Sequence, residues 1–376
     1  MEYKVIGLMS GSSLDGLDIA FVQLQENGGK WSYTILQADC YEYNSTWITR
    51  LKNAIQLNAL DYQLLHTEFG HYLGQQVNIF IAKNNLHHKV NLISSHGHTT
   101  FHLPEKLMTA QLGDGAAIAA ETQLPVVTDL RAMDVAFNGE GAPIVPIGEK
   151  ILLGVYTYFL NLGGIANISA NINKSFVAFD VCAANRVLNM LAEEKGFAFD
   201  DDGKLAAAGN INDELLQRLN ELEYYKRSYP KSLANDFGIE TVFPIIKQSL
   251  LSIEDAVRTY VEHIVLQIKN AITRTVENHK PGPIGSSGLA QTTNYKLLAT
   301  GGGAFNSFLI KRLKELLFEI NVEIFIPDDN LIKYKEAVIM ALMGTLRWRE
   351  EYNVLSSVTG AKRNSIGGAL WLGTEA

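Results

Sequence analysis

Cysteine is scarce in this chain of 376 residues. The only two cysteines, Cys40 and Cys182, lie far apart along the sequence and form no CxxC pair. Disulfide frameworks and thiolate metal sites need several cysteines at close and regular spacing, so the sequence predicts neither. We expect a protein of a reducing compartment.

Long apolar runs and blocks of like charge are also missing. No stretch of about 18 consecutive apolar residues occurs, which a membrane-spanning helix would require, and the N-terminal MEYKVIGLMSGSS lacks the basic start and apolar core of a secretory signal. The net charge of -8 comes without a basic cluster that could bind nucleic acid. These absences predict a cytoplasmic protein that binds neither membranes nor nucleic acid, although backbone N–H groups and a metal ion could still hold a small anion such as ATP.

The length and composition predict more than one hydrophobic core. Apolar residues make up 47% of the 376 residues and charged residues 19%, as is ordinary for a globular protein. Strand-like and helix-like segments alternate, which favours the α/β class. The Gly- and Pro-rich segment RAMDVAFNGEGAPIVP is predicted to be a loop between lobes. We expect an N-terminal lobe of residues 1–135 plus 350–376 and a C-terminal lobe of residues 136–349.

Hydrophobic periodicity and turn residues give a coarse map of the elements. The predicted strands are 3–9, 17–24, 31–43, 90–95 and 322–326, with strand–turn–strand units over 1–24 and 158–173. The predicted helices are 47–58, 62–84, 114–122, 252–278 and 334–351, and 281–288 is a predicted surface loop. In helix 252–278 the apolar positions Val257, Val261, Ile264, Ile268 and Ile272 predict one buried face.

Three glycine-rich turns each follow a predicted strand: 10–16 (SGSSLDG), 162–167 (LGGIAN) and 300–306 (TGGGAFN). Glycine allows backbone N–H groups to approach phosphate oxygens and supplies positive φ for a tight turn. None matches the Walker A or GxGxxG pattern, and each alone could be an ordinary hairpin turn. Taken together, their order resembles the actin, hexokinase and Hsp70 superfamily, which implies a two-lobe, ribonuclease H-like ATPase fold with ATP in an interlobe cleft.

Two aspartates are candidates for chemistry. Asp15 lies inside the first glycine turn, where its carboxylate could be an outer ligand of Mg²⁺ through water or simply an Asx-turn residue. Asp180 follows the apolar run 176–179 and precedes a helical pattern, so it could be the base of a phosphoryl transfer or a helix N-cap. Asp18, close to Asp15, is interpreted as structural.

Several polar residues could line a substrate pocket. His96, His98 and His102 form HGHTTFH, where the first two would share a strand face. A zinc site is one interpretation, but no further ligand stands at a known zinc spacing, and a polar wall facing the substrate is the other. Arg131 could hold a carboxylate or sugar hydroxyls with its planar fork, and Lys231 and Asn185 are similar candidates or plain surface residues.

Taken in order, the motifs resemble the anhydro-N-acetylmuramic acid kinase family from Gly7 to about Gly368. The stretches that carry this resemblance are GLMSGSSLDGLD, SSHGHTTFH, QLGDGAAIAAET, VVTDLRAMDVAFNGEGAPIVP, LNLGGIAN, FDVCAAN, YPKS, TGGGAFN, KEAVIMALMG and SVTGAKR. The family opens the 1,6-anhydro bond of anhydro-N-acetylmuramic acid with water and phosphorylates O6, giving N-acetylmuramic acid 6-phosphate and ADP. The resemblance implies this activity, ATP with Mg²⁺, a role in cell-wall recycling and a homodimer.

The resemblance also implies residue roles. Asp180 becomes the base that deprotonates the water attacking C1. The implied ATP-binding residues are Gly11, Ser12, Ser13, Asp15, Gly163, Gly164, Asn167, Gly301, Gly302, Gly303 and Asn306, with Asp15 also near Mg²⁺. The implied sugar-binding residues are His96, His98, Asp114, Arg131 and Asn185.

Three departures from the family pattern cluster on the expected sugar side. DVCAAN replaces the usual DTGPGN, His98 replaces a glutamine, and DLRAMD replaces DFRRRD. They leave open a kinase of the same fold for another amino or anhydro sugar, or a pseudokinase that binds nucleotide without chemistry. An actin- or Hsp70-like nucleotide switch is a further alternative, although 376 residues leave no room for a separate peptide-binding domain.

Overall fold

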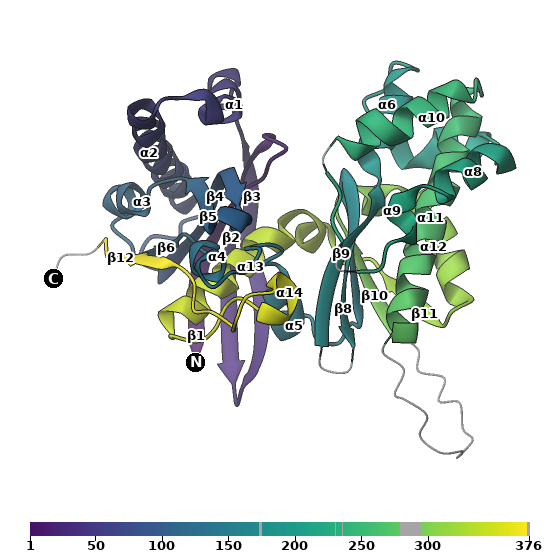
Figure 1. Ribbon diagram of the computed structural model, residues 1–376. Coiled ribbons are helices and arrows are strands. Elements are labelled where there is room, and N and C mark those ends of the chain that lie inside the picture. Colours follow the sequence, from purple (N-terminus) through teal and green to yellow (C-terminus); the bar gives the residue numbers. More distant parts are fainter. Residues whose placement is uncertain (173–174, 230, 235, 279–294, 374–376) are drawn as a thin grey trace, which may run out of the picture. The chain divides into compact units, whose positions relative to one another are not determined.

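The structure, a computed structural model, describes residues 1–172, 175–229, 231–234, 236–278 and 295–373 (Figure 1). The chain divides into two compact units, Met1–Leu153 with Tyr334–Ala376, and Gly154–Lys333. These bounds differ from the expected lobes, because residues 136–153 and 334–349 belong to the first unit. The segment 334–349 packs on the strand that holds Gly7, where an added β-carbon would collide with the backbone of Ala337. A buried ion pair, with Lys335 Nζ 3.1 Å from Glu149 Oε1, ties residues 136–153 to that segment.

The first unit is built on a mixed sheet. Its strands run in the order β12-β6-β4-β1-β2-β3, and β5 pairs with β4 outside this path. β1 is antiparallel to β2 and parallel to β4, and β2 is antiparallel to β3. The strands are β1 (Glu2–Ser10), β2 (Gly16–Asn27), β3 (Lys30–Glu42), β4 (Leu92–Leu103), β5 (Met108–Leu112), β6 (Val126–Thr128) and β12 (Ala369–Trp371).

Helices lie on both faces of this sheet. Alternate residues of β1 point to opposite faces: Ile6 and Leu8 join a core cluster with Phe69 and Leu73 of α2, whereas Gly7 faces the backbone of α13 at Ala337. The helices are α1 (Ser45–Lys52), α2 (Ala59–Lys83), α3 (Gly115–Thr122), α4 (Ala132–Ala136), α5 (Pro146–Leu152), α13 (Asp329–Trp348) and α14 (Ser356–Thr359).

The second unit repeats the arrangement of the first. Its strand order is β11-β10-β7-β8-β9: β7 is antiparallel to β8 and parallel to β10, and β8 is antiparallel to β9. The strands are β7 (Tyr158–Leu162), β8 (Ile165–Ile172), β9 (Ser175–Ala183), β10 (Tyr295–Thr300) and β11 (Val322–Phe325). A hairpin therefore begins both units, as the sequence predicted, and in each its first strand also pairs with a parallel strand.

The longest helix of the second unit, α11, packs through the predicted apolar stripe. All five predicted positions, from Val257 to Ile272, are fully buried in one core cluster with strands β7 to β9. The helices are α6 (Asn185–Glu193), α7 (Lys204–Ala208), α8 (Asp213–Asn220), α9 (Glu223–Lys226), α10 (Phe243–Gln248), α11 (Ile253–Asn278) and α12 (Ser307–Phe318). The predicted α/β class is confirmed, and no helix in the described part of the chain is long and apolar enough to cross a membrane.

Two predicted elements differ in the structure. The expected loop at 131–146 contains α4 and the start of α5. Gly139, Gly141 and Pro143 lie between the helices, and Pro146 takes the first position of α5, where a missing N–H donor costs nothing. The expected helix 47–58 ends at Lys52 and is followed by a 3-10 turn, after which Asn58 caps α2 by accepting a hydrogen bond from Asp61 N. The predicted loop 281–288 lies outside the described residues.

Candidate active site

The first glycine turn joins β1 to β2 and exposes its polar side chains. Ser12, Ser13 and Asp15 are exposed, and Ser13 Oγ donates to Asp15 Oδ1 over 2.6 Å. The turn closes through Leu14 N, which donates to Gly11 O over 3.4 Å. The glycine-containing backbone of this turn and the exposed Ser12 side chain suit a phosphate, and the adjacent carboxylate of Asp15 suits a hydrated cation.

Asp18, which the sequence reasoning treated as structural, is an unusual carboxyl group. It lies on β2 opposite Cys40 of β3, and burial raises its pKa to about 6, opposed by a hydrogen bond from Cys40. Repulsion from Asp15 and Glu336 raises the pKa further. The short spacing between Asp15 and Asp18 was the available sequence signal, but its burial could not be read from the sequence.

The second glycine turn is tighter and is attached to a helix. Only Gly163 and Gly164 separate β7 from β8, and their carbonyl oxygens accept hydrogen bonds from Asn185 N and Ala184 N, at 3.0 and 2.8 Å. The start of α6 therefore holds this turn through main-chain bonds. Asn167 follows on β8, opposite Asp180 of β9.

The third glycine turn packs onto the second. Gly301 has φ of +83°, and a β-carbon there would lie 2.9 Å from the backbone of Leu162, so only glycine fits without strain. Asn306 ends the turn and caps α12, because its Oδ1 accepts from Leu309 N over 2.9 Å. The structure thus brings the second and third predicted nucleotide turns together within one unit.

Asp180 is held by the backbone of a neighbouring segment. Its Oδ2 accepts from Leu233 N over 2.8 Å, and its main-chain N donates to Lys231 O over 3.2 Å. Tyr224 also donates its hydroxyl to Asp180 O over 2.7 Å. The N-cap interpretation is wrong, because Asp180 lies inside β9 and Ala184 occupies the cap position of α6.

The environment of Asp180 suits a proton acceptor. Burial raises the pKa of its carboxyl, and the hydrogen bond from Leu233 N opposes the shift. The pairing of β8 with β9 shifts next to it: Asn167 pairs with Asp180 and Ala166 with Cys182, so Val181 is an extra residue on β9. Such bulges are frequent beside active sites, where they re-aim a side chain.

His96 and Arg131 form a buried pair in the first unit. Arg131 Nε donates to His96 Nε2 over 2.9 Å, so the histidine is neutral and carries its proton on Nδ1, which donates to Gly97 O over 2.9 Å. Burial, assisted by the charge of Arg131, lowers the pKa of His96 to about 3. Arg131 also donates to Gly141 O over 2.6 Å, which fixes the direction of its remaining donors.

His98 contacts the first glycine turn instead. Tyr43 donates its hydroxyl to Ser10 Oγ over 2.8 Å, and Ser10 Oγ lies 3.2 Å from His98 Nδ1. Leu8 pairs with Ser95 but Ser10 with His98, so β4 carries an extra residue, with Gly97 at φ of +70°. This bulge gives the two histidines different partners. Tyr43 and Ser10 were not among the predicted site residues.

The last two predicted sugar residues have structural partners. Asp114 caps α3 by accepting from Ala116 N over 2.9 Å. Asn185 donates its amide to Leu162 O over 2.8 Å, and its Oδ1 would lie 3.1 Å from a β-carbon at Gly303. Asn185 therefore lies between the second and third glycine turns, with the residues predicted to bind ATP. It is not in the unit that holds His96, Asp114 and Arg131.

A magnesium ion is compatible with the first turn. Among the described residues, no group of three or more His, Cys, Asp or Glu could hold a metal ion, so the zinc interpretation of HGHTTFH has no support there. Magnesium keeps several waters and takes few protein oxygens. The exposed carboxylate of Asp15 is the hard, partly open donor that such an ion requires.

Comparison with known proteins gives consistent matches along the chain. Residues 3–373 match the family described as "Anhydro-N-acetylmuramic acid kinase". The enzyme of that name from Francisella tularensis subsp. novicida is 33% identical over 98% of this chain and 99% of its own, and that from Vibrio parahaemolyticus is 31% identical over 97% of each. A solved structure of the activator of the 2-hydroxyisocaproyl-CoA dehydratase from Clostridium difficile is 14% identical, with a TM-score of 0.39, over 93% of this chain and 96% of that chain.

Proposed function

This chain belongs to the anhydro-N-acetylmuramic acid kinase family, and on that premise we propose that it phosphorylates 1,6-anhydro-N-acetylmuramic acid with ATP. In the proposed reaction, water adds to C1, the C1–O6 bond breaks, and O6 takes the γ-phosphoryl group. The products are N-acetylmuramic acid 6-phosphate and ADP. The reaction would serve the recycling of peptidoglycan fragments and the use of amino sugars.

The environment of the Asp180 carboxyl is the observation that supports this proposal most directly. A general base must present an unprotonated carboxylate in a fixed direction, and its efficiency rises as its pKa approaches the working pH. Asp180 meets both needs, because Leu233 N orients its carboxylate and burial raises its pKa. We assign to Asp180 the removal of a proton from the attacking water.

The glycine turns would hold the nucleotide. Phosphoryl transfer depends mainly on positioning and on stabilising the phosphate charge, and backbone N–H groups at glycine turns serve that purpose. We assign the turns at Gly11 and Gly163 to the phosphates and the turn at Gly301 to the nucleoside. When bound, Mg²⁺ neutralises phosphate charge, and Asp15 would hold it through water.

The polar network of the first unit would bind the sugar. The Arg131 guanidinium is charged at neutral pH, since burial lowers its pKa only to about 10. His96 and Gly141 fix its orientation, which favours recognition of a carboxylate such as that of the muramic acid side chain. His98 and Asp114 are the further sugar-side residues of this proposal.

A turnover assay in ¹⁸O-labelled water tests the proposed reaction. With anhydro-N-acetylmuramic acid, ATP and Mg²⁺, mass spectrometry should find one label at C1 and an unlabelled phosphate on O6. ADP formation without a phosphorylated sugar would contradict the proposal. Because DVCAAN departs from the family pattern, a parallel panel of amino and anhydro sugars tests the second candidate, a same-fold kinase for another sugar. Turnover of a different sugar alone would favour that candidate.

We also propose a cytoplasmic homodimer, which rests on the family resemblance. Light scattering after size-exclusion chromatography measures the assembly directly. A mass near twice the 41.6 kDa of the chain is expected, and a monomer across micromolar concentrations would contradict it.

A further inference from the structure

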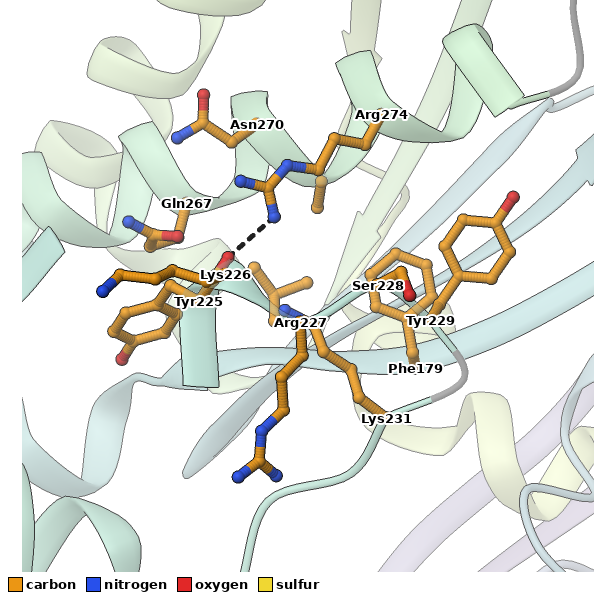
Figure 2. A pocket seen from close by; sticks show the side chains of 12 residues that line it. Phe179, Tyr225, Lys226, Arg227, Ser228, Tyr229, Lys231, Gln267, Asn270 and Arg274 are labelled. Atoms are coloured by element: carbon orange, nitrogen blue, oxygen red, sulfur yellow. Dashed lines mark hydrogen bonds between the residues drawn. The ribbon is translucent and has the colours of Figure 1, made fainter. Parts of the chain in front are cut away.

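A cavity in the second unit is lined by several cationic side chains and by no residue of the glycine turns. Its volume is about 170 Å³, far more than the ~10–15 Å³ that one water needs. It lies between β9, α11 and the segment that follows α9 (Figure 2). Its lining includes Phe179, Lys226, Arg227, Tyr229, Lys231 and Arg274.

The positive side chains that line this cavity have no acidic side chain among the other lining residues that the structure describes. Four of the described lining residues are Lys or Arg and none is Asp or Glu. Lys226 has an acid partner outside the cavity, Glu223, at 2.6 Å, and the Arg227 side chain turns away from Arg274 in Figure 2. The remaining cations are Lys231 and Arg274.

Lys231 and Arg274 enter the cavity from different elements. Arg274 comes from α11 and is steadied by its bond to Tyr225 O, at 2.7 Å, which leaves other guanidinium donors for a ligand (Figure 2). Lys231 lies over the ring of Tyr224, 4.5 Å from its centroid. Burial lowers the pKa of Lys231, and the charge of Arg274 lowers it further, so the two cations repel each other across the space.

An apolar wall completes the cavity. The rings of Phe179 and Tyr229 stack with centroids 5.2 Å apart and an angle of 10° between their planes. The Asp180 carboxylate is not part of the lining, although Phe179 and Val181 on either side of it are. The cavity is therefore separate from the proposed base.

We propose that this cavity binds a phosphate monoester, with the phosphoryl group between Lys231 and Arg274 and the carbon part against Phe179 and Tyr229. An arginine fork together with a lysine point charge is a common arrangement for phosphate. A phosphate dianion between the two cations would offset their mutual repulsion. The stacked rings offer an apolar surface to the carbon part of an ester, which inorganic phosphate lacks. The proposal does not depend on the kinase reaction.

Calorimetric titration of the full chain tests the site, with inorganic phosphate as the first probe. A saturating, non-hydrolysable ATP analogue with Mg²⁺ is present throughout to occupy the nucleotide site. Saturable binding of one phosphate is expected. Lys231→Gln and Arg274→Gln should each weaken it at least tenfold, and Arg274→Lys, which keeps the charge but loses the fork, should weaken it less. Lys269→Gln is the matched control, since it removes a charge from α11 outside the cavity and should stay within twofold.

The probe series then tests the ligand class. N-acetylmuramic acid 6-phosphate or glucosamine 6-phosphate should bind at least tenfold more tightly than inorganic phosphate, and acetate at least tenfold more weakly. Absence of saturable phosphate binding in the presence of the ATP analogue would overturn the site, as would equal weakening by Lys269→Gln. Equal binding of acetate would overturn the assignment to phosphate. Melting temperatures of all variants establish that they are folded.

Discussion

The two units share one strand arrangement but differ in the polar residues and turns that the strands carry. In each, an antiparallel hairpin leads into a parallel strand, in the order β3-β2-β1-β4 in the first unit and β9-β8-β7-β10 in the second. Each also has a β-bulge beside its candidate polar residues, at Gly97 next to His96 and His98, and at Val181 next to Asp180. The same scaffold therefore carries the proposed sugar-binding residues in one unit and the proposed base in the other.

The hairpin turns show the difference most clearly. The first is longer and exposes Ser13 and Asp15, whereas the second is closed by main-chain bonds from α6 to Gly163 and Gly164. A loop with exposed oxygens suits a hydrated cation, and a turn held by a helix start suits a rigid contact with phosphate. Two units with the same strand arrangement can therefore differ in chemistry through their turns and bulges.

The largest expected effect is the loss of turnover when the proposed base of the second unit is replaced. Asp180→Asn removes the proton acceptor but keeps an oxygen that can accept from Leu233 N, so the turnover number should fall about 10²-fold or more. Steady-state kinetics and the melting temperature of the variant check this. A turnover number within a few-fold of wild type, in a protein with unchanged melting temperature, would remove Asp180 from the mechanism.

The pH profile sharpens the same assignment. Because burial raises the pKa of Asp180 above its usual 3.8, the protonated and inactive form should persist to higher pH than for an exposed carboxyl. The acid limb of kcat/KM should therefore lie at a higher pH than for an exposed aspartate, with the rate falling as the pH drops through it. An acid limb at the pKa of an ordinary aspartate would argue against the buried base.

Gly7→Ala tests how the first unit holds its hairpin. The new β-carbon would collide with the carbonyl oxygen of Ala337 in α13, so we expect a loss of about 2–3 kcal/mol in the free energy of unfolding. Gly11→Ala is the matched control, because the nearest atom to its β-carbon would be Ser13 Oγ, at 3.4 Å. Urea denaturation measures both. Equal stabilities would show that α13 can move away from β1 without cost.

Asp18→Asn tests the half-buried carboxyl on β2, next to the first glycine turn. The pKa of Asp18 is raised from 3.8 to about 6, so the native state binds more protons than the unfolded state between these values. Wild-type stability should therefore fall as the pH rises from about 4 to about 6. The variant should be more stable than wild type at pH 8, by up to about 3 kcal/mol, and this gain should vanish below pH 4.

Denaturation of this variant at pH 4 and pH 8 measures that difference. Asp39→Asn is a suitable control on the neighbouring strand, since its ion pair with Lys83 is exposed and should contribute little. A gain for Asp18→Asn that is the same at both pH values would refute the buried-carboxyl explanation.

The smallest effect is expected from the exposed carboxylate of the first turn. If Asp15 holds Mg²⁺ through water, Asp15→Asn should raise the Mg²⁺ concentration needed for half-maximal turnover by roughly 3–10-fold, about one kcal/mol. Ser13→Ala removes the hydrogen bond to Asp15 without changing the charge and should have less effect. An unaltered Mg²⁺ requirement in Asp15→Asn would contradict the assignment.

Much of the fold could be predicted because its signals are local. The apolar stripe of α11 was visible from Val257 to Ile272, and the strand–turn–strand units were marked by the glycines at 11 and 163. The helices α4 and α5 were missed because their segment is rich in Gly and Pro, and α5 is fixed by the distant Lys335. The two compact units have other bounds than the expected lobes, because the packing of Ala337 on Gly7 joins residues that are far apart in sequence.

The sequence by itself determined the family, the α/β class and the glycine turns, because these depend on residue types in order along the chain. Only the tertiary structure decided the environments. It half-buried Asp18 against β3, placed Leu233 N on Asp180, joined His98 to Ser10, and placed Asn185 between the second and third glycine turns. These contacts join residues that are distant in sequence. Burial shifts the pKa values of their side chains, and bulges change the directions in which the side chains point.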